Sequence, residues 1–229
     1  TMDLADVDVR RFHGWDWNRT YLAERTTETV GTLYAMHWPY RQMETGRGLR
    51  RSPLHEALKN EGAVYGQVAG WERPNWFASP GQKPEYEYAW GRQNWHENHR
   101  QEHMAVREAC GLFDMASYGK LLVQGRDAEK LLSRLCSNNV AVPPGRIVYT
   151  QMLNPRGGIE ADLTVMRLDA DRFWVITPCA STRRDLAWIE DHIADGEHVF
   201  ATAITSGTSA SLSWGRTRWH CWSKSAARR

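Results

Sequence analysis

Residues 148–168 read VYTQMLNPRGGIEADLTVMRL, and this stretch decides the fold. Two apolar segments flank NPRGG, a run of the residue types that tight turns require. The stretch therefore predicts a β-hairpin with strands RIVYTQML at 146–153 and IEADLTVMRL at 159–168. Successive side chains of a strand point to opposite faces of a sheet. One face of the second strand then carries Ile159, Ala161, Leu163 and Val165, and the other carries Glu160, Asp162 and Thr164.

Further strands and helices flank the hairpin in the sequence. The predicted strands are YGKLLVQG at 118–125, RFWVIT at 172–177 and HVFATAI at 198–204. DAEKLLSRLC at 127–136 has the apolar spacing of a helix that buries one stripe, with Asp127 at the N-cap position. Thr182 and Asp185 predict a capping box that opens a second helix. Because strands and helices mix without regular alternation, we predict an α+β fold: a mostly antiparallel sheet with flanking helices.

The residues before 118 and after 206 have a different character. Helices are predicted at 20–36, 53–61 and 94–109, whereas 62–84 is rich in Gly, Pro and Trp and predicts an ordered, irregular loop. Residues 207–229 show no apolar periodicity, so ordering them would bury too little surface to offset about 1–2 kcal/mol of backbone entropy per residue. We therefore expect a smaller domain ahead of the sheet domain and a disordered or frameshifted tail.

The composition of the chain indicates which classes of binding partner and which cellular compartment to expect. The chain has 229 residues, 41% of them hydrophobic and 24% charged, and its net charge of +2 gives no general case for a nucleic-acid partner. No run of about 18 apolar residues is present, so we expect no membrane span. Four cysteines without a C-x-x-C pair predict reduced thiols in a cytoplasmic compartment.

Three groups of residues admit both a structural and a functional interpretation. Asp162 either belongs to a half-solvated strand or lines a pocket as a base or as the partner of a cationic ligand. His96, His99 and His103 have the spacing of one helix face, and a solvated face is favoured over a metal site because no further ligand completes the set. The Arg- and Trp-rich segment 50–76 favours a packed interdomain loop over nucleic-acid binding. Neither G-x-G-x-x-G nor a P-loop is present.

Longer segments resemble the dimethylglycine dehydrogenase and sarcosine dehydrogenase family, flavoproteins whose carboxy-terminal region is similar to the glycine-cleavage T-protein, an aminomethyltransferase. TMDLADVDVRRF resembles the end of the FAD-binding oxidase domain, and YAMHWP, GRGLRRSPLH and GAVYGQVAGWERPNWFA resemble the central linker domain. VREACGLFDMASYGKLLVQGRDAEKLLSRLCSNNV and GRIVYTQMLNPRGGIEADLTVMRLDADRFWVIT resemble the opening of the folate-binding domain. The implied domains are the oxidase end at 1–19, the linker domain at 20–84, the T-protein-like domain at 94–206 and the tail at 207–229.

The resemblance implies a site and a chemistry. Asp162 matches the T-protein aspartate near the reactive nitrogen of tetrahydrofolate, and Tyr149 and Thr164 match positions that line the same pocket. In the family, flavin oxidises an N-methylated glycine such as dimethylglycine or sarcosine to an iminium. Tetrahydrofolate then captures the one-carbon unit as 5,10-methylenetetrahydrofolate. The expected cofactors are tetrahydrofolate here and FAD in a longer protein; no metal, nucleic acid or membrane is expected to take part.

The resemblance also predicts what is missing. An FAD domain would precede Thr1 and the remainder of the folate domain would follow Ser206, so we expect an internal fragment that is inactive alone. Two alternatives remain open: a stand-alone aminomethyltransferase-like protein, and a non-catalytic folate-binding or interaction module. The linker motif GWERPNWF at 70–77 argues against the first.

Overall fold

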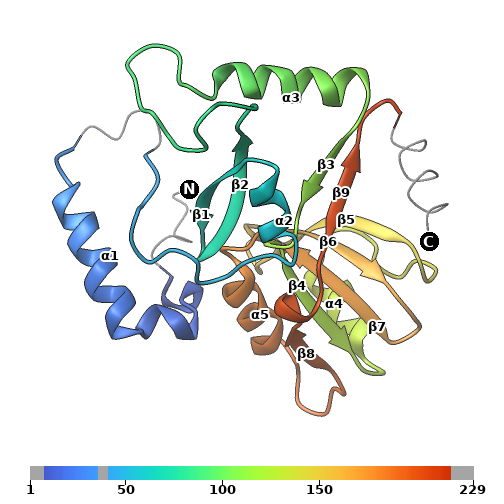
Figure 1. The fold of residues 1–229 in the computed structure, drawn as a ribbon. Helices are drawn as coiled ribbons and strands as arrows, with labels where there is room; N and C mark the ends of the chain where they lie inside the picture. Colours follow the sequence, from blue (N-terminus) through green and yellow to red (C-terminus); the bar gives the residue numbers. More distant parts are fainter. Residues whose placement is uncertain (1–7, 36–40, 218–229) are drawn as a thin grey trace. The chain divides into compact units, whose positions relative to one another are not determined.

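The computed structural model describes residues 8–35 and 41–217 of the chain (Figure 1). The chain divides into two compact units that interleave in sequence. The first takes in the described part of Thr1–Asp16 together with Tyr118–Thr208, and the second takes in Trp17–Ser117 together with the described residues from Ser209 on. Each unit is a separate structural body and is considered by itself below.

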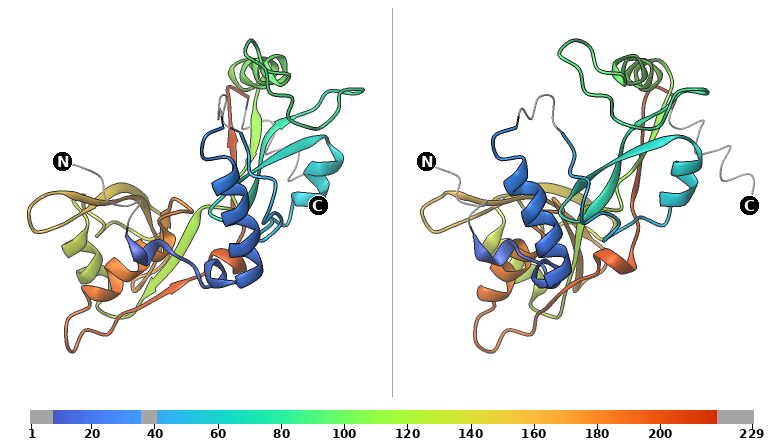
Figure 2. Two further views of the ribbon diagram at one scale, coloured as in Figure 1. Left: turned by 90° about the vertical axis from the view of Figure 1, so that its left-hand side faces the viewer. Right: turned by 60° about the vertical axis from the view of Figure 1, so that its left-hand side comes forward.

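The first unit is built on a five-stranded sheet with the order β5-β6-β7-β4-β8. The strands are β4 (Gly119–Gln124), β5 (Ile147–Leu153), β6 (Ile159–Arg167), β7 (Arg172–Thr177) and β8 (Phe200–Ala203). Every neighbouring pair is antiparallel. Helices α4 (Ala128–Leu135) and α5 (Thr182–Asp191) pack against the sheet (Figures 1 and 2). The short helices η2 (Val9–Arg11) and η4 (Thr205–Gly207) complete the unit. The predicted α+β class with a mostly antiparallel sheet and flanking helices is confirmed.

Both helices contribute to a single core on one face of this sheet. The predicted apolar stripe of α4 is buried. Burying one leucine side chain stabilises a fold by about 1.5–3 kcal/mol. The strands supply every second residue to the same core, as the alternation predicts. The buried members include Leu121, Val123, Leu131, Leu132, Met152, Ala161, Leu163, Val165, Phe173, Val175 and Ile189.

The hairpin of β5 and β6 forms as predicted, with one exception. The Asn154 side-chain oxygen accepts hydrogen bonds from the backbone N–H groups of Arg156 and Gly158, which closes the turn. Ile159, however, is 68% exposed, although we expected it to share the buried face with Ala161. The register shifts between Met152 and Leu153, so the bulge ends the regular alternation before it reaches Ile159. That part of the prediction is wrong.

The helices of the first unit begin where expected, but their predicted capping side chains have other partners. Asp127 is the N-cap residue of α4 without a side-chain capping bond, and its carboxylate accepts a hydrogen bond from the backbone N–H of His198 instead. The N-cap position of α5 is Ser181, and Thr182 is the first helical residue. Asp185 is buried and accepts hydrogen bonds from Thr177 and from its neighbour Arg184. Both acids therefore serve tertiary contacts, and the predicted capping box is wrong.

The second unit contains helices α1 (Arg19–Gly31), α2 (His55–Asn60) and α3 (His96–Glu108), together with two small antiparallel sheets. One sheet pairs β1 (Ala63–Val68) with β2 (Trp71–Phe77), and the other pairs β3 (Gly111–Asp114) with β9 (Ser211–Trp214). A short helix, η3 (Gly14–Trp17), lies at the junction of the two units in the sequence.

Two of our expectations for the second unit are wrong. Segment 62–84 is not wholly irregular, because β1 and β2 form a hairpin. Pro74 is tolerated in β2 because the register shifts there, between Val64 and Tyr65 of the opposite strand. In the tail, Ser211–Trp214 is a strand, since all four of its residues pair with β3. The rest of the predicted tail, 218–229, and the predicted oxidase end at 1–7 lie outside the described residues.

The cysteines and the helices give two further results. Cys136 and Cys179 are buried free thiols. Cys110 is disulfide-bonded, so the expectation of four reduced thiols is wrong for this residue. None of the helices within the described ranges combines the length and the apolar character that crossing a bilayer requires.

Candidate functional site: a carboxylate on the open face of the sheet

Asp162 lies on β6 with its side chain exposed, on the sheet face opposite the core. Its direct cross-strand partner is Gln151 of β5, whose side-chain Nε2 donates to Asp162 Oδ1 over 3.4 Å. Ala161 and Leu163 on either side are buried, which holds the backbone of β6 in place beneath the carboxylate. The strand thus presents a solvent-accessible acid on a rigid mount.

Tyr149 and Thr164 lie on the same face and face each other across the two strands. The pKa of Tyr149 is raised, first because its hydroxyl hydrogen-bonds the Asp162 carboxylate, and further by partial desolvation and by the negative charge of Asp162. Tyr149 is 61% exposed. The three residues that the resemblance singled out therefore come together as one cluster on two adjacent strands.

The sequence prediction did not include Gln151, although the hairpin register contains the signal for it. Gln151 is two residues from Tyr149 and thus shares its face. The loop after α4 supports this strand: Ser137 donates its backbone N–H to the Gln151 carbonyl over 2.8 Å. The Ser137 hydroxyl also donates to Gln151 Oε1 over 3.5 Å, which turns the amide NH₂ group toward Asp162. Asn138 Nδ2 donates to the Tyr149 carbonyl over 3.2 Å.

A second set of contacts holds β6 from the side of α5. Arg184 Nη2 donates to the Glu160 carbonyl over 2.7 Å, two residues before Asp162. The same guanidinium is held by the carboxylate of Asp185. Burial raises the pKa of Asp185, and the hydrogen bonds from Thr177 and Arg184 only partly oppose this effect. The strand that bears Asp162 is therefore connected to the core through a buried polar network.

The histidines of α3 and the Arg- and Trp-rich segment are the other two candidate groups. His96 and His103 are exposed on α3, and His99 Nε2 lies 3.0 Å from the Asn75 carbonyl oxygen. No group of three His, Cys, Asp or Glu side chains able to hold a metal occurs within 8–35 and 41–217. Trp71 and Trp76 are buried, with Arg50 stacked on the Trp71 ring, so neither indole is accessible to a nucleic-acid base.

Comparisons with known proteins agree with this architecture. Residues 54–215 match the family described as the GCVT N-terminal domain, and residues 1–52 match the FAD dependent oxidoreductase central domain. The crystal structure of glycine cleavage system aminomethyltransferase T from Bartonella henselae superposes with a TM-score of 0.63 at 24% identity, covering 78% of this chain and 44% of that one. The fold is therefore that of a T-protein.

Three curated relatives are considerably longer proteins. The 4-methylaminobutanoate oxidase (formaldehyde-forming) of Paenarthrobacter nicotinovorans is 45% identical over 91% of this chain and 25% of its own length. Human mitochondrial sarcosine dehydrogenase is 38% identical over 72% of this chain and 21% of its own. Mouse mitochondrial dimethylglycine dehydrogenase is 34% identical over 82% of this chain and 22% of its own length. The chain thus spans about a quarter of the length of these relatives. It belongs to the GCVT N-terminal domain family, in the form that follows an FAD-dependent oxidoreductase central domain.

Proposed function

We propose that this chain provides the tetrahydrofolate-binding part of an FAD-dependent enzyme that oxidises an N-methylated amino acid. The observation that carries the proposal is the exposed Asp162–Tyr149–Thr164 cluster in a chain whose family matches join a T-protein domain to an FAD oxidoreductase domain. The names of the three relatives describe enzymes that act on N-methylated amino acids. The favoured substrate is an N-methylated glycine, dimethylglycine or sarcosine.

The donor set of the cluster fits a reduced pterin. Asp162 offers carboxylate oxygens to ring N–H groups, Gln151 offers both an amide donor and an acceptor, and Thr164 offers a hydroxyl. The exposed Tyr149 ring gives a flat surface on which a heterocycle can stack. All four side chains stand on adjacent strands of one hairpin, so their spacing is set by the register.

Each residue would then have a distinct role. Tetrahydrofolate, when bound, supplies the nitrogen atoms that accept a one-carbon unit. The Asp162 carboxylate stabilises a nearby cationic carbon–nitrogen centre by its charge, and it accepts the proton that leaves an attacking amine. Gln151 and Tyr149 donate hydrogen bonds to this carboxylate and so keep it oriented. Transfer of the one-carbon unit to tetrahydrofolate would give 5,10-methylenetetrahydrofolate.

No residue of this chain is assigned to FAD. The sequence has no G-x-G-x-x-G or P-loop whose backbone amides could cradle the pyrophosphate. Amine oxidation is therefore proposed for a longer protein that carries an FAD-binding region, and no step of it is derived from the residues described here.

A second candidate function is favoured by the name of the 45% identical relative, a formaldehyde-forming oxidase of 4-methylaminobutanoate. In this alternative the substrate is a longer N-methylamino acid, and the one-carbon unit leaves as formaldehyde by hydrolysis, without transfer to tetrahydrofolate. The T-protein fold would then serve as a scaffold rather than as a site of transfer.

A product analysis separates the two candidates. The chain is expressed joined to an FAD-dependent oxidase region of the kind found in its relatives, and sarcosine, dimethylglycine and 4-methylaminobutanoate are compared as substrates. With saturating tetrahydrofolate, we expect 5,10-methylenetetrahydrofolate to replace formaldehyde as the product from a methylated glycine. Formaldehyde yields that do not respond to tetrahydrofolate would reject one-carbon transfer and support the second candidate.

A further inference from the structure

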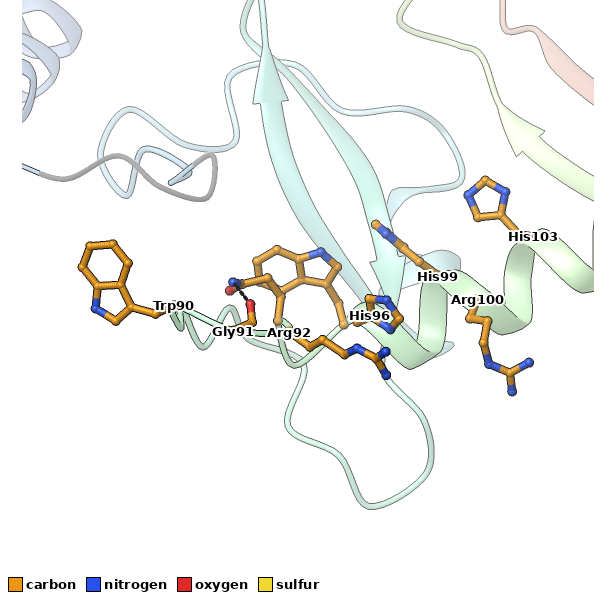
Figure 3. Close-up of a pocket in the computed structure, with 9 residues that line it drawn as sticks. Trp90, Gly91, Arg92, His96, His99, Arg100 and His103 are labelled. Atoms are coloured by element: carbon orange, nitrogen blue, oxygen red, sulfur yellow. Dashed lines mark hydrogen bonds between the residues drawn. The ribbon is translucent and has the colours of Figure 1, made fainter.

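A pocket in the second unit shares no residue with the proposed folate site. It has a volume of about 590 Å³, within the range of small-molecule sites. Its walls come from one continuous stretch of chain: the loop before α3 and the first two turns of that helix (Figure 3). The lining residues are Trp90, Gly91, Arg92, Gln93, Trp95, His96, His99, Arg100 and His103.

The lining residues give this pocket a basic character. Two arginines and three histidines line it, and no acidic residue does. Glu97 neutralises Arg100 through two hydrogen bonds, from Nη2 over 2.6 Å and from Nε over 2.8 Å. Arg92, by contrast, forms no ion pair or hydrogen bond with any residue of 8–35 or 41–217. The guanidinium of Arg92 is therefore available for an anion.

The loop that carries Arg92 also exposes an indole. Trp90 is 79% exposed, and no ring contact or hydrogen bond within the described part of the chain involves its side chain. The loop around it is nevertheless well braced. Gln93 Oε1 accepts from the Ala89 N–H over 3.0 Å, and Gln93 Nε2 donates to the Gly91 carbonyl over 3.1 Å. The backbone of the braced loop therefore has little conformational entropy left to lose on binding.

The inner wall of the pocket is equally well ordered. Trp95 packs edge-on against Tyr86, with ring centroids 5.1 Å apart, and against Tyr88, with centroids 5.9 Å apart. It is also stacked 6.4 Å from the buried Trp76. Because these rings fix Trp95 from behind, its pocket side is a rigid aromatic surface. The pocket thus combines flat apolar walls with an unpaired guanidinium and the N–H groups of exposed histidines.

We infer that this pocket binds an aromatic carboxylate. The flat ring packs against the indole of Trp95, where a face contact buries apolar area. The carboxylate pairs with Arg92, whose planar fork matches the geometry of two carboxylate oxygens, and the His96 ring lies beside it as an N–H donor. The ligand site is formed within residues 90–103 alone and is independent of the proposed folate chemistry.

The test is calorimetric titration of the 229-residue chain with 2-naphthoate. Cyclohexanecarboxylate has the same charge without a flat ring, and 2-naphthylmethylamine has the ring with the opposite charge at neutral pH. We expect saturable binding of 2-naphthoate and at least about tenfold weaker binding of both analogues, the effect of one lost charge-assisted or aromatic contact. Equal binding of the three compounds, or no saturation by 2-naphthoate at millimolar concentration, would overturn the inference. Tighter binding of naphthyl phosphate would overturn the assignment to carboxylates.

Matched variants locate the site. Arg92→Gln should weaken 2-naphthoate binding about tenfold, whereas Arg107→Gln, an exposed arginine in the last turn of α3 outside the pocket, should leave it unchanged. Because Arg92 and Arg107 are both exposed, each variant should keep the wild-type melting temperature. Equal affinities of the two arginine variants would show that binding occurs elsewhere.

Discussion

Replacing Asp162 with Asn tests the proposed site most directly. The side chain is exposed on a strand whose neighbouring residues are buried, so the substitution removes no core contact. Asn keeps an Oδ1 atom that can still accept the 3.4 Å hydrogen bond from Gln151. The free energy of unfolding should therefore change by no more than about 0.5 kcal/mol. What the substitution removes is the negative charge and the ability to accept a proton.

We expect that loss to slow one-carbon transfer by about 10²- to 10⁴-fold, the usual effect of losing a positioned acid–base group. This range corresponds to about 2.7–5.4 kcal/mol in the transition state, at least five times the expected change in stability. Amine oxidation should continue at the wild-type rate, because the proposed function assigns it to an FAD-binding region and not to this cluster. Released formaldehyde should then replace 5,10-methylenetetrahydrofolate as the main product.

The assay uses the chain joined to an FAD-dependent oxidase region and measures flavin reduction, formaldehyde and 5,10-methylenetetrahydrofolate with saturating tetrahydrofolate. Asp195→Asn is the matched control, because Asp195 is an exposed carboxylate in a turn remote in sequence from the hairpin. An unchanged yield of 5,10-methylenetetrahydrofolate in the Asp162 variant would exclude Asp162 from the transfer. A parallel loss of flavin reduction would show that the residue acts in the oxidation instead.

Four further outcomes are expected. In the chain alone, Asp162→Asn should lower the pKa of Tyr149, because the hydrogen bond to the Asp162 carboxylate is the largest cause of the raised pKa. NMR titration of labelled tyrosine measures this pKa, and an unchanged value in the variant would contradict the contact. The purified chain should carry no flavin and oxidise neither sarcosine nor dimethylglycine, and a stoichiometric flavin absorbance would refute this. Glu72→Gln should destabilise the second unit by about 1–3 kcal/mol in urea unfolding, because it breaks a largely buried pair with the partly exposed Arg47. Burial would raise the pKa of Glu72, but the hydrogen bonds from Arg47 and from the Gly48 N–H lower it overall. The stability contributed by the Glu72–Arg47 pair is therefore present above about pH 4.5 and is lost as the pH falls through the lowered pKa. A variant whose loss of stability is the same at pH 3 and at pH 7 would contradict this. Deleting the chain from Ser209 on should destabilise the second unit, since it removes the partner of β3, and an unchanged melting temperature would show that β9 contributes nothing.

The sequence alone determined the elements whose signals are local. Alternation within 159–168 and the turn residues NPRGG encode a hairpin, and the apolar stripe of 127–136 encodes a helix with one buried side. These patterns also placed Asp162 and Thr164 on the polar face, because side chains alternate along a strand whatever packs against it. The resemblance to folate-dependent dehydrogenases then singled out Asp162, Tyr149 and Thr164 from all other polar residues.

Only the tertiary structure decided which groups meet across the chain. Gln151 becomes the partner of Asp162 through the register of two strands, and Ser137 orients its amide from a loop that is distant in sequence. Asp127 and Asp185 occupy positions typical of helix-capping residues. Asp127 instead accepts a hydrogen bond from the backbone N–H of the distant His198, and Asp185 accepts one from the buried Thr177 hydroxyl. A buried donor left without a partner costs more than a helix cap contributes. In the same way, Ser211–Trp214 becomes a strand because β3 supplies its hydrogen-bond partners, a fact that no periodicity within the segment could encode.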